Sequence, residues 1–432
     1  ADLPEGWWNW PNVLEAHKLL SRACLRDVPV YPHGRYDGRG VVICAGGKRM
    51  FTNAWVCLRM LRHLGCDLAV EFWHLPDEID SYMAGLIGAY GAACVDARET
   101  GDRLGAEPRI LGGWELKAFA MLHTRFREVL LLDADNVPVV NPDFLFETPQ
   151  FRSCSAIFWP DFGRMAPSRP MWSAAEVPYR DEPEIESGQI VLDKARCWTA
   201  LNLAMHYNNH SDYYYHLIHG DKCTFQFAWH RPDTAYAMPE HGIHALEATM
   251  CQHDFDGRRI FQHRNTDKWR LDGSNHRVRD FWLEADCRHF LVELASKWNG
   301  QPYSTSDISV PARRLRCEIA GRRFVYHRVG FDRREMVLLE SGKIGSGTAD
   351  CERRWCVDMR GGTPQVVISG EDGVICRLVR ACDGTLKGRW LRHERMPVEM
   401  IPIVETQADV RLFDFRNPDN RAQSLVHRVD AG

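Results

Sequence analysis

Residues 128–136 read EVLLLDADN, an apolar run followed by two carboxylates. A short buried strand is predicted over Glu128–Asp133 from its apolar run Val129–Leu132. Asp133 and Asp135 follow it one residue apart, and alternate side chains point the same way wherever both belong to the pleat. Carboxylate oxygens suit a hard cation such as Mg²⁺ or Mn²⁺, which bridges the oxygens of a diphosphate. The stretch therefore predicts a metal–diphosphate site at a strand end, with capping of the next turn as the alternative role of the acids.

Strand and helix signals alternate around this stretch. The predicted strands are 40–44, 68–73 and 93–95, and the predicted helices are 51–64, 77–89 and 114–126. This succession is typical of an α/β fold with a parallel or mixed sheet and helices on both faces. Such sheets bind ligands beyond the carboxyl ends of their strands. The strand-end candidates for binding a nucleotide are Ala45, Gly46, Gly47 and Asp96.

We expect four parts along the chain. They are an N-terminal arm with a helix (1–37), a catalytic α/β domain (38–300), an antiparallel β-sandwich or small barrel (303–405) and a C-terminal tail (406–432). Short β runs separated by turn signals such as Asp372-Gly373 predict the β domain. Acceptor binding, self-association and support of the catalytic domain remain open roles for it. Trp7, Trp8 and Trp10 are expected to dock the arm on the main core rather than to stack on a sugar.

The composition excludes several classes of protein. The 432 residues include 54 Lys+Arg and 58 Asp+Glu, which gives a formal net charge of −4, and 45% are hydrophobic. This balance excludes a largely disordered chain, and it offers no basic stripe for a nucleic-acid backbone. No apolar run is long enough to span a bilayer and Ala1–Pro4 has no leader pattern, so we expect no transmembrane segment.

Cysteine usage bears on location and on metal binding. The 15 cysteines are scattered, many in apolar segments, which indicates buried reduced thiols of a cytoplasmic protein, peripheral to a membrane at most. Cys351 and Cys356 have no matching second pair, and His206 and His210 have no carboxylate at ligand spacing, so we do not expect zinc. No G-x-S-x-G sequence is present, which disfavours a serine hydrolase.

Further motifs extend the pattern in chain order. They are Lys117–Ala120, Glu128–Val139, Glu186–Gln189, Gly220–Lys222, Gln252–Asp254 and Phe261–Asn265. In this order, over residues 40–270, they resemble the fungal α-1,3- and α-1,2-mannosyltransferase family and, more distantly, the glycogenin-type retaining glycosyltransferases. The resemblance implies a GT-A fold, a glycan or other hydroxyl acceptor, and a nucleotide-sugar donor, with GDP-mannose favoured over a UDP-hexose. Retention of the anomeric configuration is implied by the family alone.

The same resemblance implies a divalent cation, Mn²⁺ or Mg²⁺, and its ligands. Asp135 binds the ion directly, Asp133 lies beside it and nearer the ribose, and His263 after an apolar strand is the late ligand. Imidazole beside two carboxylates is more compatible with Mn²⁺ than with Mg²⁺.

Other residues are candidates for the reaction itself. Positive charge must stabilise the departing diphosphate, and the candidates are Lys117, Lys222 and Lys268, each with a solvated surface charge as the alternative. On the sugar side, Glu186 and Gln189 precede a β run and are expected to face the cleft. Glu186 is expected to contact the donor sugar, and its role as a nucleophile is a further option.

Four candidates complete the predicted site. Asp221 opens a predicted helix, so its catalytic role competes with N-capping. Trp159 offers an apolar ring for a sugar, Asp161 is expected to bind acceptor hydroxyls, and Asn265 is a further substrate candidate.

Two other function classes stay open at this level. A sugar nucleotidyltransferase uses the same metal–diphosphate geometry, although Ala45–Arg49 matches its glycine-rich signature only in part. A non-catalytic carbohydrate-binding protein would recognise a glycan through the β domain. A homo-oligomer is also compatible with the sequence.

Overall fold

A computed structural model describes residues 6–76, 78–298, 300, 310–339, 342–349, 351–360, 362–370, 373–391 and 396–403. The chain divides into two compact units between Ser304 and Thr305. The predicted tail, 406–432, lies outside the described residues.

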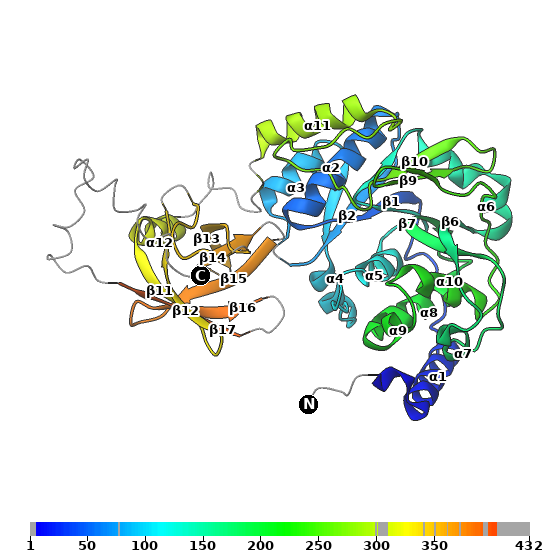
Figure 1. The fold of residues 1–432 in the computed structure, drawn as a ribbon, viewed down its shortest axis with the longest axis horizontal. Helices are drawn as coiled ribbons and strands as arrows, with labels where there is room; N and C mark the ends of the chain where they lie inside the picture. Colours follow the sequence, from blue (N-terminus) through cyan, green and yellow to red (C-terminus); the bar gives the residue numbers. More distant parts are fainter. Residues whose placement is uncertain are drawn as a thin grey trace, which may run out of the picture. The chain divides into compact units, whose positions relative to one another are not determined.

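The first unit is built on a six-stranded sheet of order β3-β2-β1-β4-β7-β6 (Figure 1). Its strands are β1 Arg39–Cys44, β2 Ala69–His74, β3 Ala92–Asp96, β4 Glu128–Asp133, β6 Ala156–Arg164 and β7 Pro183–Asp193. Strands β1 to β4 are parallel, whereas β7 runs antiparallel to both β4 and β6. The predicted α/β fold with a mixed sheet is therefore confirmed, and the predicted strand 128–133 has the observed bounds.

Helices cover both faces of this sheet (Figure 1). They are α2 Gly47–His63, α3 Ser81–Gly88, α4 Ala97–Leu104, α5 Leu116–His123, α6 Pro149–Cys154, α7 Pro170–Ala174, α8 Trp198–Asn209, α9 Ser211–Leu217, α10 Lys222–His230 and α11 Glu284–Lys297, with the 3₁₀ turn η2 at Pro142–Glu147. Side chains of β4 alternate between two cores, Leu130 and Leu132 joining α2 and α11, and Val129 and Leu131 joining α5, α8 and α10. Because both faces are buried, the strand is apolar without interruption.

A second sheet of four strands, in the order β5-β10-β9-β8, continues from the end of β4. Its strands are β5 Asn136–Pro138, β8 His244–Leu246, β9 Thr249–His253 and β10 Arg259–His263. The antiparallel register of β5 and β10 pairs Asn136 with His263. This register brings the end of β10 beside the turn that carries Asp135.

The N-terminal arm docks on the first unit, as predicted. It consists of the turn η1 Trp7–Asn9 and helix α1 Pro11–Arg26. The Trp8 ring stacks on His216 with a centroid distance of 4.0 Å, and Trp7 packs against the core of α8 to α10. Trp10 is 42% exposed and takes little part in this packing.

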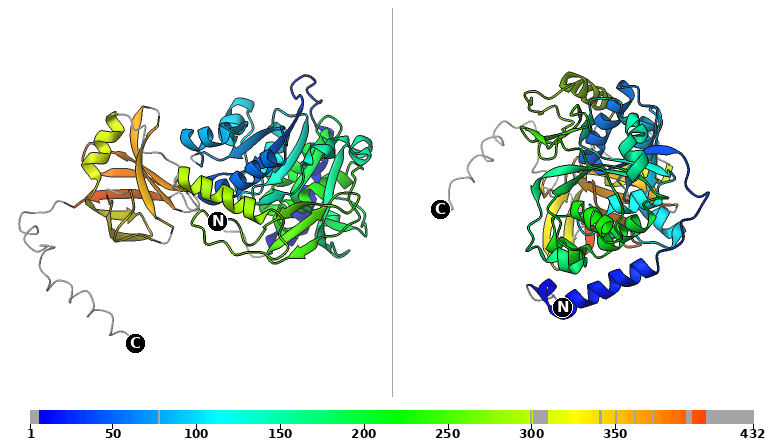
Figure 2. Two further views of the ribbon diagram at one scale, coloured as in Figure 1. Left: turned by 90° about the horizontal axis from the view of Figure 1, so that it is seen from above. Right: turned by 90° about the vertical axis from the view of Figure 1, so that its right-hand side faces the viewer.

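The second unit is one seven-stranded antiparallel sheet with helix α12 Val310–Ile319 against it (Figure 2). Its strands are β11 Arg323–Arg328, β12 Asp332–Val337, β13 Arg354–Arg360, β14 Thr363–Gly370, β15 Gly373–Arg380, β16 Leu386–Trp390 and β17 Pro397–Pro402. Isolated bridges at Lys343 and Ile344 link the β12 and β13 edges. The predicted two-sheet sandwich is therefore wrong, because one bent sheet and α12 enclose a single core, and the small-barrel alternative is nearer.

Two expectations from composition concern the cysteines and the helices. Each of the 15 cysteines is a free thiol, and the expected burial holds for eight of them, whereas Cys317, Cys351 and Cys382 are exposed. No helix among the residues described above is both long and apolar enough to cross a bilayer.

Candidate active site

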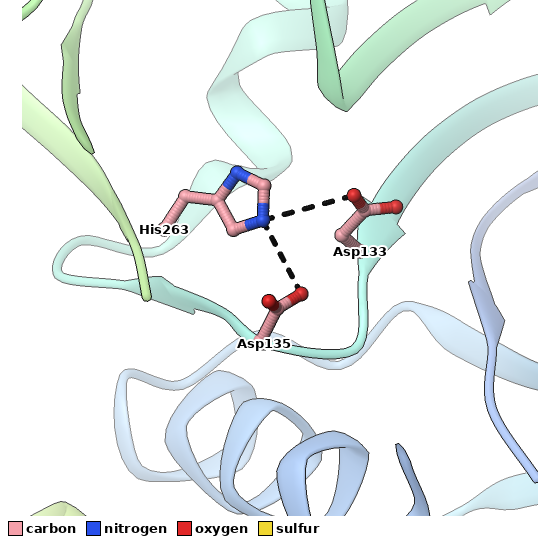
Figure 3. A group of neighbouring side chains, drawn as sticks. All are labelled: Asp133, Asp135 and His263. Atoms are coloured by element: carbon pink, nitrogen blue, oxygen red, sulfur yellow. Dashed lines mark ion pairs between the residues drawn. The ribbon is translucent and has the colours of Figure 1, made fainter. Parts of the chain in front are cut away.

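Asp133, Asp135 and His263 converge at the junction of the two sheets (Figure 3). One ligand atom from each lies within 4.8 Å of the others. His263 Nε2 is 3.2 Å from Asp135 Oδ1 and 3.7 Å from Asp133 Oδ2. Asp135 lies in the turn between β4 and β5, so the predicted convergence through the strand pleat is wrong. The turn instead directs Asp135 toward Asp133 and His263. A hydrogen bond fixes this turn, since the backbone N–H of Arg264 donates to the Asp135 carbonyl at 3.0 Å.

The charges of this triad are strongly coupled. Burial alone lowers the pKa of His263, but Asp135 and Glu186 outweigh it and raise the pKa well above its usual value. Burial raises the pKa of Asp135, yet His263 and Lys268 bring it below the ordinary value. For Asp133, burial dominates and raises the pKa despite Lys117. The triad is thus a buried group of fixed charges rather than a solvated acidic surface.

The donor set fits a divalent cation. Two carboxylates and one imidazole suit Mn²⁺, and a six-coordinate ion would keep positions for diphosphate oxygens. The other imidazole nitrogen, Nδ1, is 3.0 Å from Glu186 Oε1, a contact that orients the ring. Among the residues described, this is the single group of three or more such side chains with ligand spacing, so neither His206–His210 nor Cys351–Cys356 forms a second one.

A buried lysine joins the triad to helix α10. Lys117 Nζ lies 2.8 Å from Asp133 Oδ1 and 3.4 Å from Asp221 Oδ2. Burial lowers the pKa of Lys117, but these two carboxylates outweigh it and raise the pKa above its usual value. Asp221 occupies the N-cap position of α10, yet its side chain makes no capping bond and accepts from Ser187 Oγ at 3.0 Å. The capping alternative for Asp221 is therefore excluded.

Strand β7 supplies the third side of the site. Glu186 accepts hydrogen bonds from the Gly188 backbone N–H at 2.7 Å and from the Gln189 side chain. Gln189 is fully buried, and its Oε1 accepts from Asn136 Nδ2 at 2.7 Å. The expectation that Gln189 faces the cleft is therefore wrong, because its amide is used in positioning Glu186 beside His263.

Lys268 reaches the triad, while Lys222 does not. Lys268 Nζ forms an ion pair with Asp135 and donates to the backbone carbonyl of Asn265 at 3.2 Å. Lys222 pairs instead with Asp161 and with Glu184, the latter at 2.8 Å. Asp161 is thus neutralised by a lysine, in a separate charge group on β6, β7 and α10.

Trp159 and Asp96, which were predicted to contact a sugar and the nucleotide, have structural roles instead. Trp159 is fully buried, and its indole N–H donates to the His253 carbonyl at 2.8 Å. The prediction that its ring receives a sugar is wrong, since β6 directs it into the core. Asp96 Oδ1 caps α4 by accepting from the N–H groups of Arg98 and Glu99.

The loop after β1 leads to a basic pocket that sequence reasoning missed. A Cβ at Gly46 would lie 2.6 Å from the Glu78 Cβ, so a glutamate side chain occupies the space beside this glycine. Ala45 is buried, and Gly47 begins α2 with a φ of +63°. A pocket of about 390 Å³ follows, and its lining residues are Lys48, Arg49, Thr52, Thr266, Lys268, Trp269, Arg270, Leu271 and Asp272. The basic pair Lys48-Arg49, which follows the end of a strand, is the sequence feature that could have predicted this pocket.

Gly188 was also missed as a determinant of the site. A Cβ at this position would lie 2.6 Å from His263 Nδ1 and even nearer to the Glu186 carboxylate. We expect Gly188→Ala to displace His263 and to lower turnover by about a hundredfold, as misplaced active-site groups do. Gly163→Ala is the matched control on neighbouring β6, because no atom lies within 4 Å of its Cβ position. Equal turnover of the two variants, both with unchanged circular dichroism, would contradict the expectation.

The mixed sheet, with one acid at the end of central strand β4, a second in the turn after it and a histidine from the end of β10 beside them, defines the first unit as a GT-A-type domain. Residues 38–182 and 175–263 match the family model described as "Mannosyltransferase putative", more than half of the chain. The chain belongs to this mannosyltransferase family.

Curated relatives come from fungi. Alpha-1,2-mannosyltransferase MNN2 of Saccharomyces cerevisiae is 26% identical over 284 residues, which cover 52% of this chain and 47% of that protein. Alpha-1,2-mannosyltransferase MNN21 of Candida albicans is 27% identical over 269 residues, 49% of this chain and 40% of that protein. The chain thus spans less than half the length of these two relatives.

Solved structures align at lower similarity. Mouse xyloside xylosyltransferase 1 is 16% identical with a TM-score of 0.32, covering 46% of this chain and 85% of that chain. Core-mannan synthase A from Aspergillus fumigatus is 11% identical with a TM-score of 0.32, covering 49% of this chain and 74% of that chain. At these scores the alignments carry no argument about mechanism.

Proposed function

We propose that the chain transfers a mannosyl group from GDP-mannose to a hydroxyl of a glycan, with Mn²⁺ or Mg²⁺ bound at the triad. The convergence of Asp133, Asp135 and His263 within 4.8 Å is the observation that carries the proposal. Membership of the mannosyltransferase family supports mannose as the transferred sugar. Two lysines beside the triad, Lys117 and Lys268, support a reaction in which a diphosphate departs.

Each group then has a role in holding charge. Asp133, Asp135 and His263 would hold the ion, which when bound supplies Lewis-acid stabilisation of the departing diphosphate. Lys117 lowers the pKa of Asp133 against the effect of burial and holds its carboxylate in place, and Lys268 would exchange its pairing with Asp135 for the phosphate oxygens. The pocket lined by Lys48, Arg49 and Lys268 is where we place the rest of the nucleotide, because its cations complement an anion.

Anomeric retention is part of the proposal, and Glu186 bears on how it is achieved. Both Glu186 oxygens already accept hydrogen bonds, from Gly188, Gln189 and His263, and the residue is 5% exposed. Such a carboxylate is poorly placed to act as a nucleophile. We therefore favour attack by the acceptor on the face from which the diphosphate departs, with Glu186 orienting His263.

A donor screen tests the proposal. GDP, and not UDP, is expected to raise the melting temperature in the presence of Mn²⁺, and EDTA is expected to abolish the effect. Purified protein with GDP-mannose and an α-mannoside acceptor should release GDP. The one-bond C1–H1 coupling constant of the new glycosidic bond, measured by NMR, identifies the anomer of the product. Release of pyrophosphate from GTP and mannose 1-phosphate would instead identify a nucleotidyltransferase. Absence of any diphosphate effect with Mn²⁺ would overturn the assignment.

A further inference from the structure

An exposed tryptophan lies next to the Lys117–Asp221 side of the candidate site. Trp114 is 50% exposed, and its backbone carbonyl accepts from the Lys117 N–H at 3.1 Å. Its ring lies 3.4 Å from the Cβ position of Gly220, the residue before Asp221. The Trp114 backbone is thus bonded to the start of α5, and its ring lies beside the residue that precedes Asp221.

The loop that carries Trp114 is fixed from below. Glu115 is fully buried, and its carboxylate accepts from the Gly113 N–H at 2.9 Å and from Ser211 Oγ at 2.7 Å. These bonds tie the loop to the start of α9. In the same loop, Ile110 and Leu111 are 42% and 61% exposed. The loop, bonded to α9 through Glu115, thus presents Ile110, Leu111 and Trp114 to solvent, and a group of exposed apolar side chains is typical of a binding surface.

The surroundings leave one part of the indole open. Tyr215 and His219 stand at centroid distances of 6.3 and 6.5 Å, both tilted against the ring. Gly112, two residues before Trp114, and Gly220 lie against the ring without side chains, and a Cβ would lie 3.3 Å from the ring at Gly112 and 3.4 Å from it at Gly220. The two glycines keep the indole uncrowded. A flat ring bordered by a phenol and an imidazole matches a pyranose, which has an apolar C–H face and polar edges.

We propose that Trp114 is the platform on which a pyranose of the acceptor glycan stacks. This inference rests on the proposed transferase function and extends it to the acceptor. It assigns to an exposed ring the contact that buried Trp159 cannot make. Stacking at Trp114 would bring the acceptor to the side of the site formed by Lys117 and Asp221, while the basic pocket at Lys48 and Arg49 takes the nucleotide.

Binding is tested first, by fluorine NMR on protein labelled with 5-fluorotryptophan. Trp114→Phe and Trp10→Phe identify the two resonances, and Trp10 is the control because it is similarly exposed on the N-terminal arm. With GDP and diamagnetic Mg²⁺ present, at least one of methyl α-mannoside, methyl α-glucoside and methyl β-galactoside should shift the Trp114 signal and leave the Trp10 signal unchanged. If GDP binds but none of the three methyl glycosides shifts the Trp114 signal, the proposed platform is refuted while the transferase assignment stands. If neither GDP nor UDP binds with Mn²⁺, both fail.

Kinetics tests the role in catalysis. We expect Trp114→Ala to raise the acceptor KM about tenfold, the loss of one aromatic contact, with the donor KM and donor hydrolysis unchanged. Trp114→Phe should recover most of the loss because it restores an aromatic face, and Trp10→Ala should have no effect. An unchanged acceptor KM in Trp114→Ala, or an equal rise in the donor KM, would overturn the proposal.

Discussion

Replacing Asp135 with asparagine is expected to lower kcat at least about a thousandfold, the size of effect seen when a central electrostatic group is lost. Asp135 is 1% exposed and lies between His263 and Lys268, so it carries the charge that would hold both the ion and the lysine. Asparagine keeps the shape and removes the charge. GDP release from GDP-mannose measures kcat, and titration with Mn²⁺ measures the affinity for the ion, which should fall in parallel.

Asp143→Asn is the matched control for this variant. Asp143 lies in a surface hollow with Arg39 and Glu128. These two residues begin β1 and β4, so the hollow lies at the opposite end of the strands from the triad. Its removal should leave both kcat and Mn²⁺ affinity unchanged. Full turnover of Asp135→Asn with a native melting curve would show that the triad does not hold the ion.

Replacing Lys117 with methionine is expected to reduce both stability and activity. The side chain is buried between Asp133 and Asp221, and its loss leaves two carboxylates without their shared cation. Breaking a buried pair in this way costs about 3–5 kcal/mol in the free energy of unfolding. Urea unfolding measures that loss, and GDP release should fall by about a hundredfold because Asp133 is no longer held.

The double variant Lys117→Met with Asp221→Asn separates the two effects. It removes one of the two unpaired charges, so we expect part of the unfolding free energy to return while turnover stays low. Lys297→Met is the surface control, since that lysine side chain is 41% exposed and forms its ion pair with Glu293 at the surface. Stability of Lys117→Met equal to that of Lys297→Met would contradict a buried charge cluster.

Part of the first unit follows from local pattern. The apolar run of β4 and the first acid after it were predicted with the observed strand bounds, because a buried strand needs apolar residues on both faces. The family resemblance implied His263 as a ligand beside Asp133 and Asp135, and the structure brings the three together. The location in the cytoplasm stays a prediction from cysteine usage.

Residues whose role depends on face or register could not be assigned in the same way. Trp159 and Asp161 both follow the apolar start of β6, where the strand pairing with β7 is irregular. A shift of one residue reverses which side chains are buried, so sequence alone could not tell a core tryptophan from a sugar platform. Gly188 matters only because Glu186 and His263, from different strands, meet beside it.

By itself, the sequence determined that a strand ends in two acids inside an α/β domain, since hydrophobic period and turn residues act between chain neighbours. The tertiary structure alone decided that Lys117 and Asp221 close one side of the triad, that Gln189 supports Glu186, and that the Trp114 ring is exposed. The first contact joins segments far apart in the chain, and all three features depend on strand order, register and burial, which emerge only when the two cores pack.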